Sequence, residues 1–214
     1  MKHSAHRRHL LTLAASTAAA ALLLTGCDKA PADGAAAAAP PPPKGNFKAV
    51  DITGADYGQA LALQDVDGQP RTLADYKGKL VVVFFGFTQC PDVCPSTLAE
   101  FVAIKQALGA DGAKLQPVFV TVDPDRDTAA ILKAYMAAFD PGFVALRGTP
   151  EQTLAAAKSF KVFYQKVPGK TPGSYTMDHT AAAYVFDPQG RARLFVRYGQ
   201  PMADWVSDLK QLLV

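Results

Sequence analysis

The chain has 214 residues, of which 49% are hydrophobic and 19% are charged. This balance excludes wholesale disorder, collagen-like repetition and a polytopic membrane protein. Three of the 22 Lys and Arg residues precede Cys27 and none of the 19 Asp and Glu residues does, so the remainder carries 19 side chains of each sign. Nucleic-acid binders gain affinity by releasing counterions from clustered Lys and Arg, and this neutral remainder therefore argues against a nucleic-acid partner.

The first 27 residues have the pattern of a secretory leader. Lys2, Arg7 and Arg8 give a positive start, and the apolar stretch 10–24 leads through small residues to Cys27. The stretch is shorter than the roughly 20 apolar residues of a transmembrane helix, which disfavours the alternative of an uncleaved signal anchor.

The end of this leader resembles the lipobox of bacterial lipoproteins. The sequence Leu-Thr-Gly-Cys at 24–27 implies by this resemblance that Cys27 is acylated and becomes the first residue of the mature chain. Asp28 resembles the signal that retains Gram-negative lipoproteins in the inner membrane. We therefore expect a lipid anchor on the periplasmic face of the bacterial inner membrane, reached through either the Sec or the Tat export route.

Residues 28–46 have the composition of a tether. They include the alanine run 35–39 and the proline run 40–43, and they contain no large apolar side chain that could build a core. Proline runs favour extended polyproline II, which rises about 3.1 Å per residue. The predicted organisation is a lipoprotein signal peptide over 1–27, a tether over 28–46 and one globular domain over 47–214.

The domain alternates strands and helices. The run 80–87 has no polar alternation, which predicts a central strand buried on both faces. In chain order we expect a hairpin around the Asp67-Gly68 turn, the strand 80–87, a helix over 95–108, a strand over 118–122, a helix over 128–139, a strand over 160–165, a Pro/Gly-rich loop over 168–178, a hairpin of strands 181–186 and 194–198, and an amphipathic helix through 205–212. This order is typical of an α/β fold with thioredoxin-like layers, in which helices flank a central sheet, here with an N-terminal hairpin.

Two cysteines and one histidine are the candidate functional residues. Once the leader is removed and Cys27 is lipidated, the domain keeps only Cys90, Cys94 and His179. The cysteines follow the predicted strand 80–87 at its carboxyl end, where ligands gather in open α/β folds. Their spacing places both sulfurs on one side of a helical turn.

The predicted helix start suggests reactive sulfurs. Free N–H groups at a helix N-terminus favour the thiolate, so we expect the pKa values of Cys90 and Cys94 to be low. A structural disulfide is the alternative reading, because this spacing does not exclude the bond.

His179 lies immediately before the predicted strand 181–186. In thioredoxin-like proteins the turn at this position bears a cis-proline that packs against the cysteine pair. We therefore expect His179 to face Cys90 and Cys94. The three side chains would then form a soft metal site, or a redox pair with a neighbouring imidazole.

Three motifs together resemble the Sco/SenC family. They are FFGFTQCPDVCP at 84–95, DPDRDT at 123–128, and DHT at 178–180 with GQ at 199–200. Members of this family are membrane-tethered copper proteins with a thioredoxin fold that help to build the binuclear copper centre of cytochrome c oxidase. The resemblance implies that Cys90, Cys94 and His179 are the copper ligands. It also implies that Asp123 lies near the site, where it either orients a ligand or caps the next helix.

The donor set agrees with copper on chemical grounds. Thiolates favour Cu(I), and imidazole accepts Cu(I) or Cu(II). Zinc would require a fourth ligand, and the domain has no further Cys or His. Met177 and Met202 could supply a thioether, but methionine more often serves packing.

Two functions stay open. The first is a copper metallochaperone, not itself an enzyme, that delivers the ion to the copper-receiving subunit of cytochrome c oxidase or to a periplasmic copper carrier. The second is a thiol:disulfide oxidoreductase in which Cys90 and Cys94 form the redox-active pair and keep the copper-ligand cysteines of the oxidase reduced. A peroxidase with the same layer order is a third alternative.

Overall fold

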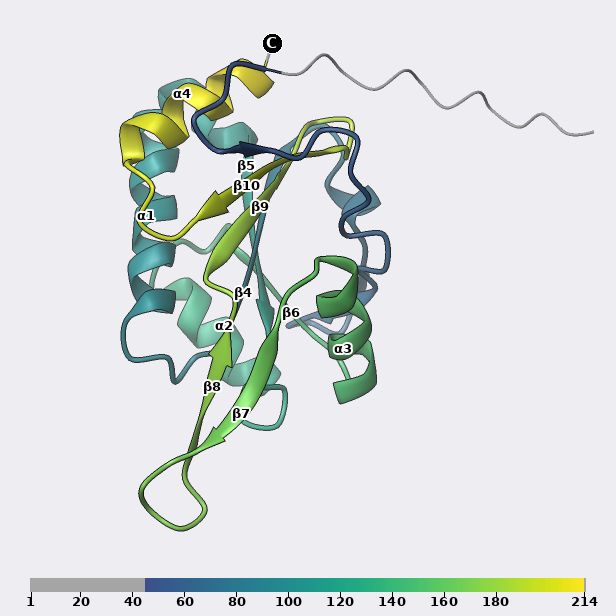
Figure 1. The fold of residues 1–214 in the computed structure, drawn as a ribbon, viewed down its shortest axis with the longest axis vertical. Helices are drawn as coiled ribbons and strands as arrows, with labels where there is room; N and C mark the ends of the chain where they lie inside the picture. The colour runs from purple at the N-terminus through teal and green to yellow at the C-terminus, as the bar shows by residue number, and fades with distance from the viewer. Residues whose placement is uncertain (1–44, 214) are drawn as a thin grey trace, which may run out of the picture. The chain divides into compact units, whose positions relative to one another are not determined.

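The computed structural model describes residues 45–213. An eight-stranded mixed sheet has the order β1-β10-β9-β4-β5-β6-β2-β3, and β7 and β8 form a separate two-stranded sheet (Figure 1). The strands are β1 Val50–Asp51, β2 Leu63–Asp65, β3 Pro70–Arg71, β4 Leu80–Gly86, β5 Leu115–Thr121, β6 Val144–Arg147, β7 Tyr164–Pro168, β8 Tyr175–His179, β9 Ala182–Phe186 and β10 Ala192–Arg197. The α-helices are α1 Val93–Ala107, α2 Ala129–Ala137, α3 Pro150–Ser159 and α4 Met202–Leu212, and 3-10 helices span Leu73–Tyr76 and Gly109–Lys114.

The predicted signal peptide, the lipid attachment at Cys27 and nearly all of the tether lie outside the described residues. Between residues 45 and 213, no helix has the length and apolar character needed to cross a bilayer.

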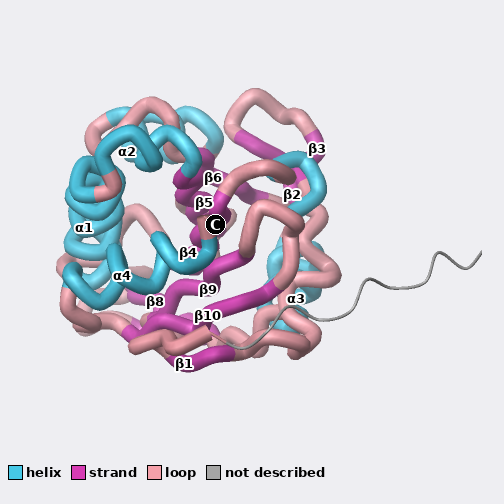
Figure 2. Tube along the Cα trace, turned by 90° about the horizontal axis from the view of Figure 1, so that it is seen from above, coloured by secondary structure: helices cyan, strands magenta, loops and turns pink. Residues whose placement is uncertain are grey.

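Strand β4 is the centre of the domain. It pairs in parallel with β5 and antiparallel with β9, and all of its residues are buried. The Phe84 ring meets Phe101 of α1 edge-on at 6.3 Å, whereas the Phe85 ring meets Phe160, just after α3, at 5.1 Å. Since successive side chains point to opposite faces of a strand, both faces of β4 are covered. The predicted double burial is confirmed, and Figure 2 shows α1, α2 and α4 on one side of the sheet with α3 on the other.

The other predicted elements are found with small shifts in their bounds. The Asp-Gly turn joins β2 to β3, which are antiparallel, and β9 and β10 form the second hairpin. Thr128 begins α2, and its Oγ1 accepts the N–H of Ile131 at 3.3 Å. Trp205 of α4 is buried and packs edge-on against Phe101 at 5.8 Å. The predicted fold class, thioredoxin-like layers around a central sheet, is confirmed.

The region 144–165 differs from the prediction. No element is predicted for β6 or α3, and the strand expected over 160–165 begins only at Tyr164, because Phe160 closes α3. The start of α3 nevertheless has a local sequence signal. Thr149 and Gln152 form a reciprocal capping box around Pro150, the first residue of the helix.

The loop expected over 168–178 is largely a hairpin. Strands β7 and β8 pair from Tyr164 opposite His179 to Pro168 opposite Tyr175, so only the short connection 169–174 is a turn. Gly173 has φ +81° there, which favours glycine. The inward residues Tyr175, Met177 and His179 alternate with exposed ones, which is the period of a strand.

Asp208 joins α4 to the start of the described chain. Its carboxylate is 1% exposed and accepts the N–H of Lys48 at 2.9 Å and that of Ala49 at 2.8 Å. We expect Asp208→Ala to lower the free energy of unfolding by about 2–3 kcal/mol, because two donors lose a charged acceptor. Urea unfolding measures the loss, and Ser207→Ala, on the exposed face of the same helix, should change stability by less than about 0.5 kcal/mol.

Candidate metal centre

The structure brings the three predicted site residues together. Cys90 precedes α1, Cys94 lies in its first turn, and His179 is the last residue of β8. The Sγ of Cys94 lies 3.7 Å from Nε2 of His179, and the two sulfurs and a ring nitrogen all lie within 4.8 Å of one another. Both cysteines are free thiols. The site therefore sits at the carboxyl end of β4, where β8 approaches the start of α1.

Cys90 is the more accessible of the two thiols. Its side chain is half-buried, and its Sγ accepts the backbone N–H of Cys94 at 3.4 Å. Its own N–H donates to the carbonyl of Phe87 at 3.3 Å, which fixes the turn between β4 and α1. The backbone N–H of Cys94, at the start of α1, thus points at the Cys90 sulfur, as the sequence predicted.

Cys94 differs from the expectation of a low pKa. Its side chain is 0% exposed, and this burial raises the pKa of the thiol well above its ordinary value. A hydrogen bond with the backbone of Phe87 acts in the opposite direction but is outweighed. The prediction fails because it counted the helix N-terminus and not the desolvation of a sulfur beneath the first turn. Burial of Cys94 therefore favours the neutral thiol over the thiolate.

Gly86 makes room for this buried sulfur. A Cβ atom at Gly86 would lie 2.8 Å from Sγ of Cys94 and 2.8 Å from the Phe119 ring. Both distances are shorter than any ordinary van der Waals contact. The last residue of β4 is therefore a glycine because the Cys94 side chain packs directly against the backbone of the strand.

His179 presents a neutral imidazole to the sulfurs. Its ring packs edge-on against Phe84 at 6.2 Å and Phe87 at 5.9 Å, and this burial lowers the pKa of the imidazole. Nδ1 lies 3.2 Å from the carbonyl oxygen of Thr180. The contact assigns the proton to Nδ1, so that the lone pair of Nε2 points towards Cys94, the tautomer that binds a metal ion.

Asp123 lies near the site but does not touch the three donors. Within residues 45–213 its carboxylate forms an ion pair with Nε of Arg126 and accepts the hydroxyl of Tyr175 at 2.9 Å. The cap of α2 is Thr128, not Asp123. The carboxylate therefore neither holds a ligand directly nor caps the helix; it connects the end of β5 to β8.

Asp127, in the motif at 123–128, holds the turn before Cys90, a role that the sequence does not predict. It is 0% exposed and accepts the N–H and the hydroxyl of Thr88 at 3.1 Å and 2.6 Å. It also accepts the Thr121 hydroxyl at 2.5 Å. Because Thr88 lies two residues before Cys90, Asp127 fixes the turn that carries the first sulfur. The motif at 123–128 has three acidic residues, and no local pattern indicates that Asp123 and Asp127 are buried whereas Asp125 is exposed.

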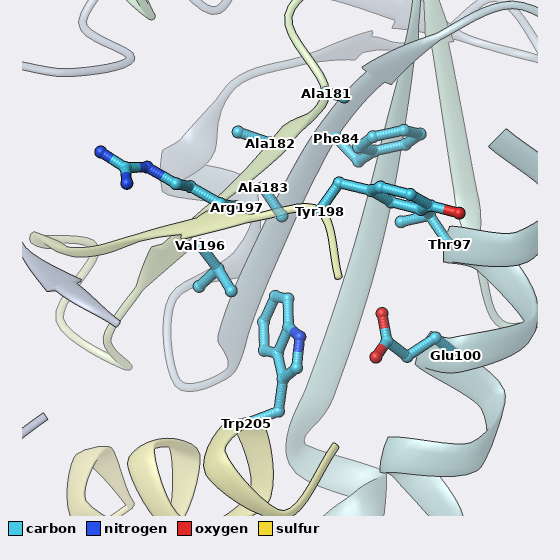
Figure 3. Close-up of a pocket in the computed structure, with 10 residues that line it drawn as sticks. All are labelled: Phe84, Thr97, Glu100, Ala181, Ala182, Ala183, Val196, Arg197, Tyr198 and Trp205. Atoms are coloured by element: carbon cyan, nitrogen blue, oxygen red, sulfur yellow. The ribbon is translucent and has the colours of Figure 1, made fainter. Parts of the chain in front are cut away.

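A small cavity lies between the strands β4, β9 and β10 and the helices α1 and α4 (Figure 3). It is lined by Phe84, Thr97, Glu100, Ala181, Ala182, Ala183, Val196, Arg197, Tyr198 and Trp205. Its volume of about 10 Å³ is roughly the room of one water molecule, so the cavity is not a substrate site. Figure 3 shows the Glu100 carboxylate directed towards Trp205, and burial raises the pKa of that carboxyl.

The two candidate thioether ligands differ in their surroundings. Met177 is partly buried against the core, on the inward face of β8, two residues before His179. Met202, at the start of α4, is 46% exposed. Packing accounts for Met177 without a metal ion.

The fold and the site together define a class of protein. Thioredoxin-like layers with two thiols and a neutral imidazole at the end of the central strand form a soft donor set that can hold a metal ion or exchange disulfides. A family model described as SCO1/SenC matches residues 50–214, and the chain belongs to this family. The family resemblance seen in the three sequence motifs is confirmed.

Known relatives agree with this assignment. The mouse protein named "Protein SCO2 homolog, mitochondrial" is 40% identical over 139 residues, which are 64% of this chain and 53% of the relative. The chain thus spans about half the length of this mouse relative and of its bovine counterpart. Bradyrhizobium japonicum ScoI, solved with copper bound, is 39% identical, with a TM-score of 0.67 over 73% of this chain and 99% of that one. BsSco, described as having a disulfide switch and as a member of the Sco family of cytochrome c oxidase assembly proteins, is 25% identical, with a TM-score of 0.55 over 71% of this chain and 90% of that one.

Proposed function

We propose that the protein binds one copper ion through Cys90, Cys94 and His179 and delivers it during assembly of the binuclear copper centre of cytochrome c oxidase. The observation that carries this proposal is the convergence of the three donor atoms within 4.8 Å. The copper-bound structure of ScoI, which shares 39% of its aligned residues with this chain, supports the choice of metal.

The spacing of the donors suits ligation. Metal–sulfur bonds of about 2.3 Å and metal–nitrogen bonds of about 2.0–2.1 Å, separated by about 120°, place the two donor atoms about 3.8 Å apart. The Cys94 sulfur and the His179 nitrogen are 3.7 Å apart. Little rearrangement is required to accept an ion. Two thiolates select Cu(I), and binding displaces the proton of Cys94.

The accessibility of the site suits transfer. Three donors leave the ion open to a competing ligand, and the half-buried Cys90 is the sulfur that a recipient can approach. The recipient would be the copper-receiving subunit of the oxidase or a periplasmic copper carrier. The lipobox at Cys27 and the tether 28–46 support a domain held at the periplasmic face of the inner membrane.

Copper titration of the reduced protein tests the ligand set. We expect one tight equivalent, with a dissociation constant raised about 100-fold in His179→Ala, because the ion loses one of three ligands. Met177→Leu, on the same face of β8, is the matched control. Its dissociation constant for copper should stay within about threefold of that of the parent. Unaltered affinity in His179→Ala would defeat the ligand assignment.

A thiol:disulfide oxidoreductase is the second candidate. The two free thiols within 4.8 Å of each other and the disulfide switch described for BsSco favour it. In that reaction Cys90 and Cys94 become a disulfide, and a disulfide between the copper-ligand cysteines of the oxidase is reduced to two thiols. The reaction needs no imidazole ligand. Rescue of oxidase activity by His179→Ala in a strain lacking this protein would favour the reductase, whereas failure to rescue favours copper delivery.

A further inference from the structure

Strand β8, which carries His179, joins the eight-stranded sheet at one end only, where residues 180–181 lead into β9. Strands β7 and β8 pair with each other and, within residues 45–213, with no strand of the eight-stranded sheet. Figure 1 shows the hairpin extending away from that sheet. Backbone pairing with the main sheet therefore does not fix the length of β8 before His179, and side-chain contacts are needed to hold that part of the hairpin against the cysteine turn.

Arg126 supplies such contacts. Its Nη1 donates to the carbonyl oxygen of Tyr175 in β8 at 2.8 Å, and the guanidinium lies 3.6 Å from the centre of the Tyr175 ring. Its Nε pairs with Asp123, which also accepts the Tyr175 hydroxyl at 2.9 Å. One guanidinium thus holds the backbone and the ring of the same β8 residue, and one carboxylate orients both side chains.

The same guanidinium reaches the cysteine turn. Nη1 also donates to Oε1 of Gln89 at 3.0 Å, and the guanidinium lies 5.9 Å from the centre of the Phe87 ring. Gln89 directly precedes Cys90, and the Phe87 ring packs against His179. Arg126 is therefore in contact with both segments that must meet for the three donors to converge.

The geometry of a strand transmits this hold to His179. Tyr175 and His179 are four residues apart in β8, and both face inward. Because side chains repeat every two residues along a strand, holding Tyr175 against the domain also keeps the face of β8 that bears His179 turned towards the cysteine turn.

We infer that Arg126 is the positioning residue that holds the β7–β8 hairpin, and with it His179, over the cysteine pair and thereby slows release of the bound copper ion. The inference rests on the proposed copper-binding function. Arginine suits the task because its planar guanidinium can pair with Asp123 through Nε and donate to Gln89 and Tyr175 through Nη1 while stacking on an aromatic ring, whereas lysine offers a compact ammonium group. Asp123 acts in the same assembly by orienting the guanidinium.

The test measures copper release from the full protein. The variant Arg126→Met removes the fork and keeps an unbranched side chain. We expect Cu(I) to pass to a chelator in excess about tenfold faster than from the parent, the size of effect seen when residues around metal ligands are removed. With Cu(II) bound, the sulfur-to-copper absorption band should also shift or weaken, because the imidazole is no longer held in place.

Arg147→Met is the matched control. Arg147 donates to the carbonyls of Pro124 and Asp127, in the same segment as Arg126, but among the described residues it has no contact with the hairpin. The variant Arg147→Met should lower the melting temperature of the protein without changing the rate of copper release or the sulfur-to-copper absorption band. The positioning role is wrong if Arg126→Met and Arg147→Met both release copper faster than the parent to the same extent. It is also wrong if both release copper at the parental rate.

A second variant covers the case in which Arg126→Met does not fold. Arg126→Lys keeps a cation opposite Asp123 but loses the fork, and it should release copper severalfold faster than the parent. Amide hydrogen exchange should accelerate in residues 164–179 of this variant and not in β4. Release and exchange that match the parent would overturn the inference.

The ligand variant separates the two proposals. In the same release assay, His179→Ala should lose copper rapidly. If His179→Ala releases copper at the parental rate, the proposed ligand set fails. If it releases copper quickly while the Arg126 variants do not, only the positioning role fails.

Discussion

Cys90 is expected to react with iodoacetamide about 1,000 times faster than Cys94 in the reduced, metal-free protein. Cys90 is half-buried, whereas Cys94 is 0% exposed, and burial raises the pKa of its thiol well above the ordinary value. Alkylation requires a thiolate in contact with the reagent. Cys94 must therefore wait for a local opening, and an opening free energy of about 4 kcal/mol corresponds to this ratio.

Mass spectrometry of peptides from a timed reaction near pH 8 measures the two rates. In urea-unfolded protein the rates should converge within about threefold, which shows that the difference arises from the fold. Similar rates in the native protein would contradict the buried position of Cys94. Copper should protect Cys90 as well, because a ligated sulfur does not react.

The asymmetry assigns an order to either proposed chemistry. In copper transfer, the recipient's ligand would displace Cys90 first, and Cys94 with His179 would hold the ion until the second bond breaks. In disulfide exchange, the Cys90 thiolate would attack and form a mixed disulfide, and Cys94 would then resolve it as its proton leaves. The buried sulfur acts second in both cases, so the two functions share one geometry.

The sequence predicted the centre of the fold and the site because the relevant signals are local. The unbroken apolar run of β4 requires cover on both faces, and Cys90 and Cys94 follow it directly. His179 was predicted in a different way, from the comparison with thioredoxin-like proteins, in which the turn before this strand packs against the cysteine pair.

The wrong prediction for Cys94 depends on packing that no local pattern contains. The pKa of Cys94 is set by its burial against Gly86 and the Phe119 ring, residues that the fold brings together from β4 and β5. The Pro/Gly content of 168–178 suggested a loop, although those residues occupy only the turn of a hairpin and the end of β7. The sequence around Arg126 does not indicate its contacts with the cysteine turn and the hairpin, because Gln89 and Tyr175 lie 37 and 49 residues away in the sequence.

Asp127→Ala is expected to lower the free energy of unfolding by about 4 kcal/mol. The carboxylate is fully buried, and it accepts the Thr88 N–H, the Thr88 hydroxyl and the Thr121 hydroxyl. Each hydrogen bond to a charged group contributes about 1.5–3 kcal/mol, and alanine leaves three donors without an acceptor, while loss of a buried charge offsets part of the penalty. Urea unfolding of the reduced protein measures the change.

Asp125→Ala is the matched control, because Asp125 lies two residues earlier and is exposed. It should change stability by less than about 0.5 kcal/mol. The loss of unfolding free energy in Asp127→Asn should lie between those of Asp125→Ala and Asp127→Ala. The amide keeps one acceptor oxygen, but its N–H donors face the donors of Thr88 and Thr121. A loss below about 1 kcal/mol in Asp127→Ala would mean that water replaces the carboxylate, and that the Thr88 turn does not depend on it. A loss of the expected size, with weaker copper binding in the folded fraction, would instead tie the stability of the cysteine turn to the affinity of the site.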